Sequence, residues 1–399
     1  MRSTDPLDIA IVGAGPTGLA LGIALARQGY GVDVLDHQDA HALAAPADDG
    51  REIALTHASV GLLRELGIWP HLPAAAIGRI REARVTDGGP ASPALRFHTA
   101  GTGCEALGAI VANHAIRRAC FAAAASQERL RLHPGQRVQQ VHIDADHAHI
   151  VREGGAPLRA RLLVAADSRF SGLRRQLGVG AALQDFGRTM VVCRVAHEAA
   201  DHGEVAHECF GPERTLAMLP LPGRFSSAVL TVPGAQASRL CSLPADAFAQ
   251  EIQRQFGDGL GPLRLAGERH AYPLVATYAE RFAGHRFALA GDAAVGMHPV
   301  TAHGFNLGLQ GVRSLCAALS QRPLSDDPGQ ADRLQQYERV HRRETAPIYH
   351  GTNAVARLYA GQTGPHRLLR SLVLEAARRL PPVRAAITRQ LIGAGPARF

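Results

Sequence analysis

The stretch from Asp8 to Asp36 limits the fold of this chain more than any other part of the sequence. A short apolar run, Ile9 to Val12, leads directly into the segment GAGPTG at residues 13–18, and an alanine- and leucine-rich segment follows. A second β-like run then ends in the acid Asp36. Strand, glycine turn, helix, strand and acid follow one another in the order that a dinucleotide-binding βαβ unit requires.

The glycines of this motif have separate tasks. Gly13 makes the tight turn, Gly15 lets the backbone approach a pyrophosphate, and Gly18 lets the helix pack against the strand. The helix that begins near Pro16 offers unpaired N–H groups and the positive end of its dipole to the phosphates. Asp36 is placed to accept the hydroxyls of an adenosine ribose. The motif therefore predicts nucleotide binding, against the alternative of a glycine turn in an ordinary α/β domain.

Composition bounds the rest of the molecule. At 399 residues the chain can bury a sizeable core in one large or two moderate domains. The apolar fraction is 46% and the mean hydropathy is −0.04, and no apolar run approaches the ~18 residues that a membrane-spanning helix needs. Residues 18–26 resemble the apolar part of a signal peptide, but the glycine motif explains them better and no cleavage-site pattern follows. We therefore expect an intracellular protein.

The cysteines and the charged residues exclude several kinds of site. The six cysteines are scattered without a CxxC pair, which argues against zinc sites, iron–sulfur clusters and disulfide frameworks, so no metal is expected. The net charge is +8, and all 43 basic residues are arginines, which excludes any mechanism that depends on lysine. The arginine excess has two explanations that stay open: base composition of the coding DNA, or an anionic partner such as a cofactor phosphate or a membrane surface.

Hydrophobic periodicity divides the chain into two kinds of segment. Helices are predicted at 56–69 and 110–125, and strands at 79–99, 137–153 and 161–166. Between about 185 and 275 the pattern changes to β-runs separated by Pro and Gly, with one helical piece from Ala245 to Phe256, which predicts a separate sheet. Nucleotide-domain character returns at 286–292, and the remainder is mostly helical.

Three motifs in order carry a family resemblance. They are GAGPTG at 13–18, ADSRFSGLR at 166–174, and the segment that begins with GDAA at 291–294 and extends to Gly308. Together they resemble the single-component flavoprotein aromatic hydroxylases, the class A monooxygenases related to p-hydroxybenzoate hydroxylase. The segments REIAL (51–55), LGIW (66–69), HECF (207–210), LPL (219–221) and YPL (272–274) are similar to the ubiquinone-biosynthesis hydroxylases. The segment after Asp292 is similar to the branch that contains demethoxyubiquinol hydroxylases of relaxed site preference.

The resemblance implies a p-hydroxybenzoate hydroxylase-like α/β fold. In this fold a Rossmann-like FAD-binding domain carries an inserted, mostly β substrate domain and a C-terminal helical region. The expected FAD-binding parts are 1–78, 101–182 and 276–345. The expected substrate-side parts are a β-rich insertion at 79–100 and a β-sheet domain at 183–275, with C-terminal helices at 346–399.

The resemblance also assigns site residues. The cofactor-binding residues it implies are Gly13, Gly15, Pro16, Thr17, Gly18, Asp36, Arg51, Arg117, Asp167, Gly291, Asp292, Gly304, Phe305 and Asn306. The resemblance places Pro299 in the loop that curls around the flavin. Chemistry suggests further candidates, because a histidine or an arginine could stabilise phenolate character on a ring: His298 and His303 in the flavin loop as catalytic candidates, and Arg188, His207 and Tyr272 from the sheet region as substrate-binding candidates. Simpler explanations compete with these roles: Asp292 could be a helix cap, Arg117 could lie on a solvated helix face, and any one histidine of twenty could be a surface or core residue.

The chain departs from the family pattern at four positions. Ser168 stands where glycine is usual, Val295 replaces a histidine, and Ala302 and His303 replace a Gly-Gln pair. Because the spacing around Pro299 is kept, the same loop is expected with altered side-chain chemistry beside the flavin.

The activity implied by the resemblance is hydroxylation of a polyprenylated phenol or quinol in ubiquinone biosynthesis. NAD(P)H would reduce FAD, and O2 would react through a flavin C4a-hydroperoxide. The protein would exclude water from the site and lower the cost of phenolate character on the ring. Two alternatives stay open: a hydroxylase of soluble aromatic compounds, and a non-catalytic flavoprotein subunit of a membrane-associated assembly. A halogenase is not expected, because halogenases of this fold rely on a catalytic lysine and a Trp-x-Trp motif. This chain has no lysine, and Trp69 is its single tryptophan.

The expected partners are the lipid substrate, O2, a membrane surface and other ubiquinone-biosynthesis proteins, and a homodimer is compatible with the sequence. Nucleic acid is not expected, because aromatic residues make up only 5% of the chain. The segment 366–392 contains six arginines and one acid, Glu375, beside an apolar stripe at helical spacing. This stripe either packs on the core of the enzyme or brings a cytoplasmic protein to the inner face of the membrane.

Overall fold

The computed structural model of the chain describes residues 7–88, 92–100, 102–198, 202–211, 214–298, 304–360, 387–389 and 391–393, with the backbone alone for 358–360. Two of the catalytic candidates, Pro299 and His303, lie outside these residues, as does segment 366–386 of the predicted tail.

The glycine motif lies in a mostly parallel sheet. Its strands run in the order β18-β19-β11-β1-β2-β8, and β10 and β9 continue it beside β11. The pairs that β1 makes with β2 and β11, and that β11 makes with β19, are parallel. The bounds are β1 (Leu7–Val12), β2 (Val32–Leu35), β8 (Leu130–His133), β9 (Val138–Ile143), β10 (Ala148–Arg152), β11 (Leu158–Ala165), β18 (Ala283–Gly284) and β19 (Phe287–Leu289).

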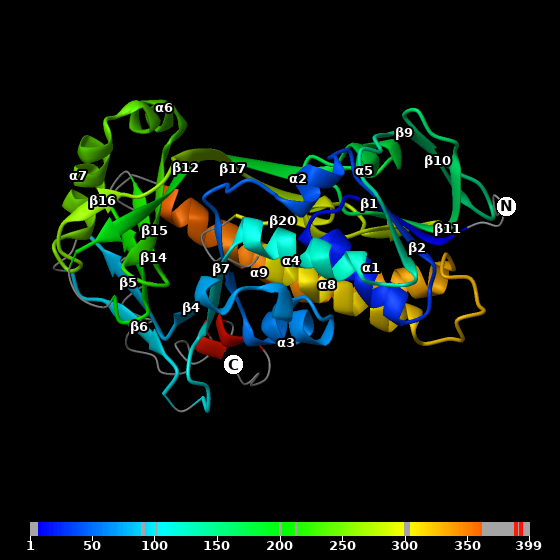
Figure 1. Cartoon of the computed structure of the whole chain (residues 1–399), viewed down its shortest axis with the longest axis horizontal. Coiled ribbons are helices and arrows are strands. Elements are labelled where there is room, and N and C mark those ends of the chain that lie inside the picture. Colours follow the sequence, from blue (N-terminus) through cyan, green and yellow to red (C-terminus); the bar gives the residue numbers. More distant parts are fainter. Residues whose placement is uncertain are drawn as a thin grey trace.

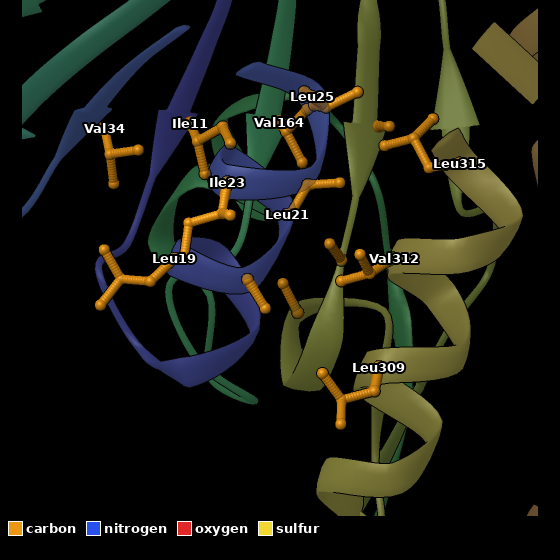
Figure 2. Packing of buried hydrophobic residues seen from close by; sticks show 14 of the residues in the cluster. Ile11, Leu19, Leu21, Ile23, Leu25, Val34, Val164, Leu309, Val312 and Leu315 are labelled. Atoms are coloured by element: carbon orange, nitrogen blue, oxygen red, sulfur yellow. The ribbon is translucent and has the colours of Figure 1, made fainter. Parts of the chain in front are cut away.

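Helices cover this sheet, and the central one follows the glycine motif. Helix α1 (Pro16–Arg27) has Pro at its first position, where the missing N–H costs nothing, and a run of leucine and alanine that favours helix. Gly22 brings α1 close to β2 and β8, since a Cβ there would lie 3.1 Å from Val34 and 2.9 Å from Leu130. Figure 2 shows Leu19 and Ile23 of α1 beside strand residues.

The remaining helices of this half of the molecule surround α1 or follow the strands. They are α2 (Ala40–Ala44), α3 (His57–Glu65), α4 (Asn113–Ala125), α5 (Gly172–Gln176), α8 (Gly304–Leu319) and α9 (Ala331–Ala360), with the short 3-10 turns η1 (Trp69–His71), η2 (Ala74–Ala76) and η3 (Gly291–Ala293). In Figure 2, Leu309, Val312 and Leu315 lie along α8 next to α1. One buried apolar cluster joins these helices to the parallel sheet.

A second, mostly antiparallel sheet forms the other half. Its order is β20-β17-β12-β15-β14-β13-β5-β6, with β16 beside β12. The bounds are β5 (Glu82–Asp87), β6 (Leu95–His98), β12 (Ala181–His197), β13 (Val205–Phe210), β14 (Thr215–Leu221), β15 (Phe225–Pro233), β16 (Leu263–Leu265), β17 (His270–Ala279) and β20 (Val295–Gly296). Figure 1 shows the two sheets toward opposite ends of an elongated molecule, with β12 and β17 running between them.

The second sheet has two different faces. One is covered by α6 (Gly234–Ser242) and α7 (Ala245–Phe256), and its side chains, such as Cys209 and Met218, pack with Phe256. The opposite face, called the inner face below, carries Ala206, Glu208, Ala217, Leu219, Val229, Val192, Met190 and Tyr272. Part of it packs against the small sheet of β3 (Glu52–Leu55), β7 (Gly108–Ala112) and β4 (Ile77–Ile80), through Ile110 and Leu219.

The predicted α/β architecture with a separate mostly β part is confirmed, whereas the domain boundaries stay predictions. The helix predicted from Ile110 begins only at Asn113, because 108–112 is strand β7, paired on both sides by β3 and β4. Helix α6 was not predicted. In the part of the chain that the structure describes, no helix is both long and apolar enough to cross a membrane.

A stability test follows from the packing of α1. Leu21 is fully buried between the sheet and its neighbours, whereas Leu183 of β12 is 60% exposed. We expect Leu21→Ala to lower the free energy of unfolding by ~2–5 kcal/mol, because it leaves a cavity in the core. The matched control Leu183→Ala should stay within ~0.5 kcal/mol of the parent in urea unfolding. Equal losses in the two variants would contradict this account of the core.

Candidate active site

The first motif shapes a backbone turn at the carboxyl end of β1. Gly13 has φ +113°, and a Cβ there would lie 2.3 Å from the carbonyl oxygen of Ala166. A Cβ on Gly18 would lie 2.0 Å from the carbonyl oxygen of Gly13, so both positions require glycine for internal packing. At Gly15 no heavy atom of the residues that the structure describes lies within 4 Å of the place a Cβ would take. The protein therefore leaves space beside the Gly15 backbone, at the amino end of α1.

Asp36 lies at the end of β2 and is held by the backbone around it. Its Oδ2 accepts from the N–H of Ala14 at 2.7 Å, and its Oδ1 accepts from the N–H of Gln38 at 2.8 Å. His37 Nδ1 also lies 3.3 Å from Oδ1, so the acceptor position that no described residue takes is the second one of Oδ2. Arg117 of α4 donates from Nη2 to Oε1 of Gln38 at 2.9 Å, which brings this arginine to the same end of the sheet.

The third motif meets the first through Thr17. Gly291 has φ +59°, and a Cβ there would lie 3.2 Å from the Thr17 side chain. A Cβ on Gly308 of α8 would lie 2.5 Å from Thr17 Oγ1. The amino ends of α1 and α8 therefore come close together, and each contributes the positive end of its helix dipole.

The start of α8 is tied to β3, the strand that directly follows Arg51. Asn306 accepts from the N–H of Thr56 at 3.1 Å through Oδ1 and donates to the carbonyl oxygen of Ala54 at 2.8 Å through Nδ2. Gly304 begins α8, and Phe305 is half-buried against the main core. The structure thus brings Thr17, Gly291 and 304–306 to one place.

Two arginines of the second motif, which sequence reasoning did not select, join it to the third. Arg169 donates from Nη2 to Oδ2 of Asp292 at 3.0 Å, and Arg174 donates from Nη1 to the carbonyl oxygen of Ala293 at 2.9 Å. Asp167 itself is exposed, with Oδ2 3.4 Å from the N–H of Leu173. The repeated arginines of SRFSGLR were the available signal, but their partners lie more than a hundred residues away.

Asp49 is a third residue that sequence reasoning did not select, and it connects the two halves of the site. Arg51 Nη2 lies 2.6 Å and Asn113 Nδ2 2.7 Å from Asp49 Oδ2, while Tyr272 Oη donates to the Asp49 carbonyl oxygen at 2.7 Å. Burial alone would raise the pKa of the Asp49 carboxyl, but the hydrogen bonds and charge of Arg51, with the amide of Asn113, hold this pKa below its usual value. Arg51 also stacks on the Tyr272 ring at 5.3 Å. The structure therefore brings Arg51 and Tyr272 together.

A neighbouring pocket of about 110 Å³ lies between segment 48–52 and the second sheet. It is lined in part by Glu52, Arg194 and His270. Glu52 Oε1 accepts from Arg194 Nη2 at 3.1 Å, which links β3 to β12. Burial raises the pKa of Glu52 to about 7, although Arg194 opposes this shift.

The other predicted residues are more widely spread. His298 is buried with its ring edge-on to Phe186 at 4.6 Å, and burial, with a smaller contribution from Arg169, lowers its pKa to about 4. His207 packs against Phe256 of α7 at 5.1 Å, on the face of the second sheet opposite to Tyr272. Arg188 pairs in register with Pro233, beside a break in the β12–β17 ladder. The structure does not bring His207 together with Tyr272.

These residues fit a flavin dinucleotide. The space beside Gly15, the two helix amino ends and the remaining acceptor position of Asp36 match a pyrophosphate and a ribose. The described residues contain no group of His, Cys, Asp and Glu that could hold a metal ion, and all six cysteines are free thiols.

Comparison with known proteins agrees with this geometry. Residues 6–347 match the family described as an FAD binding domain. The chain is 40% identical to the ubiquinone hydroxylase UbiM of Neisseria meningitidis, over 97% of this chain and 84% of that protein. It is 36% identical to the ubiquinone hydroxylase UbiL of Rhodospirillum rubrum, over 97% and 89%. It is 28% identical to the 3-demethoxyubiquinol 3-hydroxylase of Escherichia coli, over 94% and 96%.

Solved structures with the same fold include p-nitrophenol 4-monooxygenase PnpA from Pseudomonas putida, with a TM-score of 0.76 and 16% identity over 98% of this chain and 99% of that one. P. aeruginosa PqsL has a TM-score of 0.73 and 19% identity, over 89% and 96%. At these identities the likeness is one of fold. The family match and the 40% identity over nearly the whole chain go further: this chain belongs to the FAD-dependent aromatic-ring monooxygenases, in the family of the ubiquinone-biosynthesis hydroxylases.

Proposed function

We propose that this enzyme hydroxylates the aromatic ring of a polyprenylated phenol or quinol intermediate of ubiquinone biosynthesis, with O2 as co-substrate and NAD(P)H as reductant. The observation that carries the proposal is the 40% identity, over 97% of the chain, to a relative named as a ubiquinone hydroxylase. The apolar side chains of the inner face, such as Met190, Val192 and Val229, support an aromatic substrate with a hydrocarbon tail.

The roles of the cofactor residues are part of the proposal. Asp36 would accept the ribose hydroxyls, and the amino end of α1 beside Gly15 would hold the pyrophosphate. Asp292, oriented by Arg169, would accept from the flavin side chain, and the amino end of α8 would lie near the ring. When bound, FAD supplies the activation of O2 and receives the electrons of the reduced nicotinamide.

The residues around Asp49 have a positioning role in this proposal. Asp49 fixes the directions of Arg51 and Tyr272 at the boundary between the two sheets. His298 is neutral near pH 7, so it adds no charge to an apolar site. Apolar side chains that pack beside Phe186, such as Met190 and Leu274, exclude water from this boundary.

The proposed role of Asp36 predicts weaker flavin binding in a variant. Asp36→Asn replaces a carboxylate that accepts two backbone hydrogen bonds, and the loss of charge-assisted hydrogen bonding to a ribose should raise the dissociation constant for FAD by ~10–100-fold. The flavin-to-protein ratio after gel filtration, and titration of the flavin-free protein with FAD, measure this. The control Asp39→Asn alters an exposed helix cap and should keep its flavin. Unchanged flavin content in Asp36→Asn would argue against this assignment.

The activity is tested with the holoenzyme, NADPH and a prenylated phenol of short chain under ¹⁸O2. We expect phenol-stimulated NADPH oxidation and one labelled oxygen in the ring. NADPH oxidation that no phenol stimulates would favour the non-catalytic flavoprotein instead, and faster turnover of ring compounds without a prenyl chain would favour the soluble-substrate hydroxylase.

The same assay tests Tyr272. Tyr272→Phe removes the hydrogen bond to the Asp49 carbonyl oxygen, which contributes about 1 kcal/mol to the positioning of residues at the boundary between the two sheets. The yield of hydroxylated product per NADPH should therefore fall several-fold. Tyr30→Phe is the control, because its hydroxyl lies against Leu319, remote from this boundary. Equal product yields in the two variants would remove Tyr272 from the proposal.

Association with an anionic membrane surface extends the proposal, because a polyprenyl substrate resides in the bilayer. The described end of the chain contributes to the core instead: Ile392 is buried with Ile110 and Leu221, and a Cβ on Gly393 would lie 3.0 Å from Thr56. The proposed membrane contact is therefore assigned to the arginine-rich segment that precedes Ile392 in the sequence and includes Arg367, Arg370, Arg378 and Arg379.

Sedimentation with anionic liposomes tests this contact. Each arginine near an anionic leaflet contributes ~1 kcal/mol, so four Arg→Gln changes should weaken binding by up to about three orders of magnitude at low salt. The four positions are Arg367, Arg370, Arg378 and Arg379. The control changes four exposed arginines elsewhere: Arg96, Arg137, Arg254 and Arg264. If the parent protein stays in the supernatant while it hydroxylates a lipid substrate, substrate reaches it on a carrier.

A further inference from the structure

Glu208 is an acid inside the second sheet that the proposed site does not yet use. It lies in β13, which is paired on one side with β5 and on the other with β14. Side chains alternate along this strand: Cys209 packs toward α7 and His207 against Phe256, whereas Ala206 packs on the opposite side with Leu219. Glu208 therefore points to the inner face, where the aromatic substrate is proposed to lie.

No described residue partners the Glu208 carboxyl. On the inner face, Val85 of β5 and Ala217 of β14 stand opposite it in register, and neither has a polar side chain. The titratable side chain that β5 contributes to this face is Asp87, at the next alternate position after Val85, while Arg84, Glu82 and His207 belong to the other face. The small sheet packed against the inner face contributes Ile80 and Ile110, with the thiol of Cys104 nearby. An unpartnered carboxyl in such surroundings costs stability, which a ligand can offset.

Among the described residues, this part of the inner face is less covered than the face that packs on α7. Ala206, Glu208, Ala217 and Val229 are all partly accessible although they lie in inner strands of the sheet. The alternate residues that face α7, such as Leu216, Met218 and Leu230, are at most 1% exposed. Small side chains stand beside Glu208 on this face, with Ala206 two positions before it and Ala217 opposite it on β14. A flat ring would find apolar contacts there and one polar group.

We propose that Glu208 hydrogen-bonds a ring hydroxyl of the aromatic substrate and thereby sets the orientation of the ring on the inner face. This inference rests on the proposed function and names a residue that contacts substrate. Burial raises the pKa of Glu208 to about 8. Near pH 7 the carboxyl is therefore neutral, and it can both donate and accept a hydrogen bond. A neutral phenol or quinol matches this group, whereas a ring that bears a carboxylate would bring an unpaired charge into the same apolar space.

Two substitutions separate hydrogen bonding from packing. Glu208→Gln keeps the shape and a donor, and Glu208→Leu keeps an apolar side chain of similar size but no hydrogen bond. The control is Glu198→Gln, at an exposed acid paired with Arg264. The dissociation constant of a short-chain prenylated quinol for the oxidised holoenzyme is measured from the change in flavin absorbance, together with product per NADPH and the unfolding temperature.

We expect Glu208→Leu to raise the dissociation constant ~10-fold or more and to lower product per NADPH, while its unfolding temperature does not fall. Glu208→Gln and the control should bind within ~3-fold of the parent near pH 7. A group with a raised pKa keeps its proton below that pKa and loses it as the pH rises through about 8. Affinity of the parent should therefore fall between about pH 7 and about pH 9, and Glu208→Gln should not show this fall.

If Glu208→Leu keeps the parent's dissociation constant for the quinol, the pH dependence of that constant and the yield of product per NADPH, the inference is overturned while the proposed function stays intact. A parent holoenzyme that neither binds nor hydroxylates a phenol or quinol would overturn both. A loss of affinity in Glu208→Leu that follows a lowered unfolding temperature, with a parent-like pH profile in Glu208→Gln, would also count against the inference, because it assigns the effect to packing.

Discussion

The site depends on a row of backbone hydrogen bonds at the carboxyl ends of adjacent parallel strands. The N–H of Gly13 donates to the carbonyl oxygen of Leu35, that of Ala166 to Val12, and that of Ala290 to Ala165, each at 2.8 Å. Each of the three motifs thus begins where its neighbour strand ends. The carboxyl edge of a parallel sheet collects these turns whatever their separation in the chain. Arg169 and Arg174 then add side-chain contacts to an arrangement that the backbone has already fixed.

These backbone hydrogen bonds between neighbouring strands also explain which parts of the fold could be predicted from the sequence. The first βαβ unit is local, so its strand, turn and helix can be predicted from glycine spacing and apolar periodicity. Helix α4 was predicted three residues too early, because a buried strand paired on both sides is apolar throughout and lacks the alternation that marks its end. The hydrogen bonds that Asp49 makes with Asn113 and Tyr272 could not be predicted, since these partners lie 64 and 223 residues away in the sequence.

The HECF segment illustrates a different limit. His207 was selected as a substrate-binding candidate because histidine is a common acid–base group, yet its ring faces Phe256 and α7. Its neighbour Glu208 lies on the inner face of the second sheet. A strand presents successive residues to opposite faces, so a shift of one position changes which residue can contact a ligand. Only the pairing of β13 with β5 and β14 decides between them.

The long strand β12 has a mechanical consequence. It runs without interruption from Ala181 to His197 and pairs with β17 along most of that length, so one antiparallel ladder belongs to both halves of the molecule. Opening the halves as rigid bodies would require several of these backbone bonds to break together. The ladder changes register only between Asp185 and Thr189, where Gly187 has φ +62° and donates to Asp185. The ladder therefore resists separation of the two halves along its regular stretches, and this bulge is the place where local bending would break the fewest backbone hydrogen bonds.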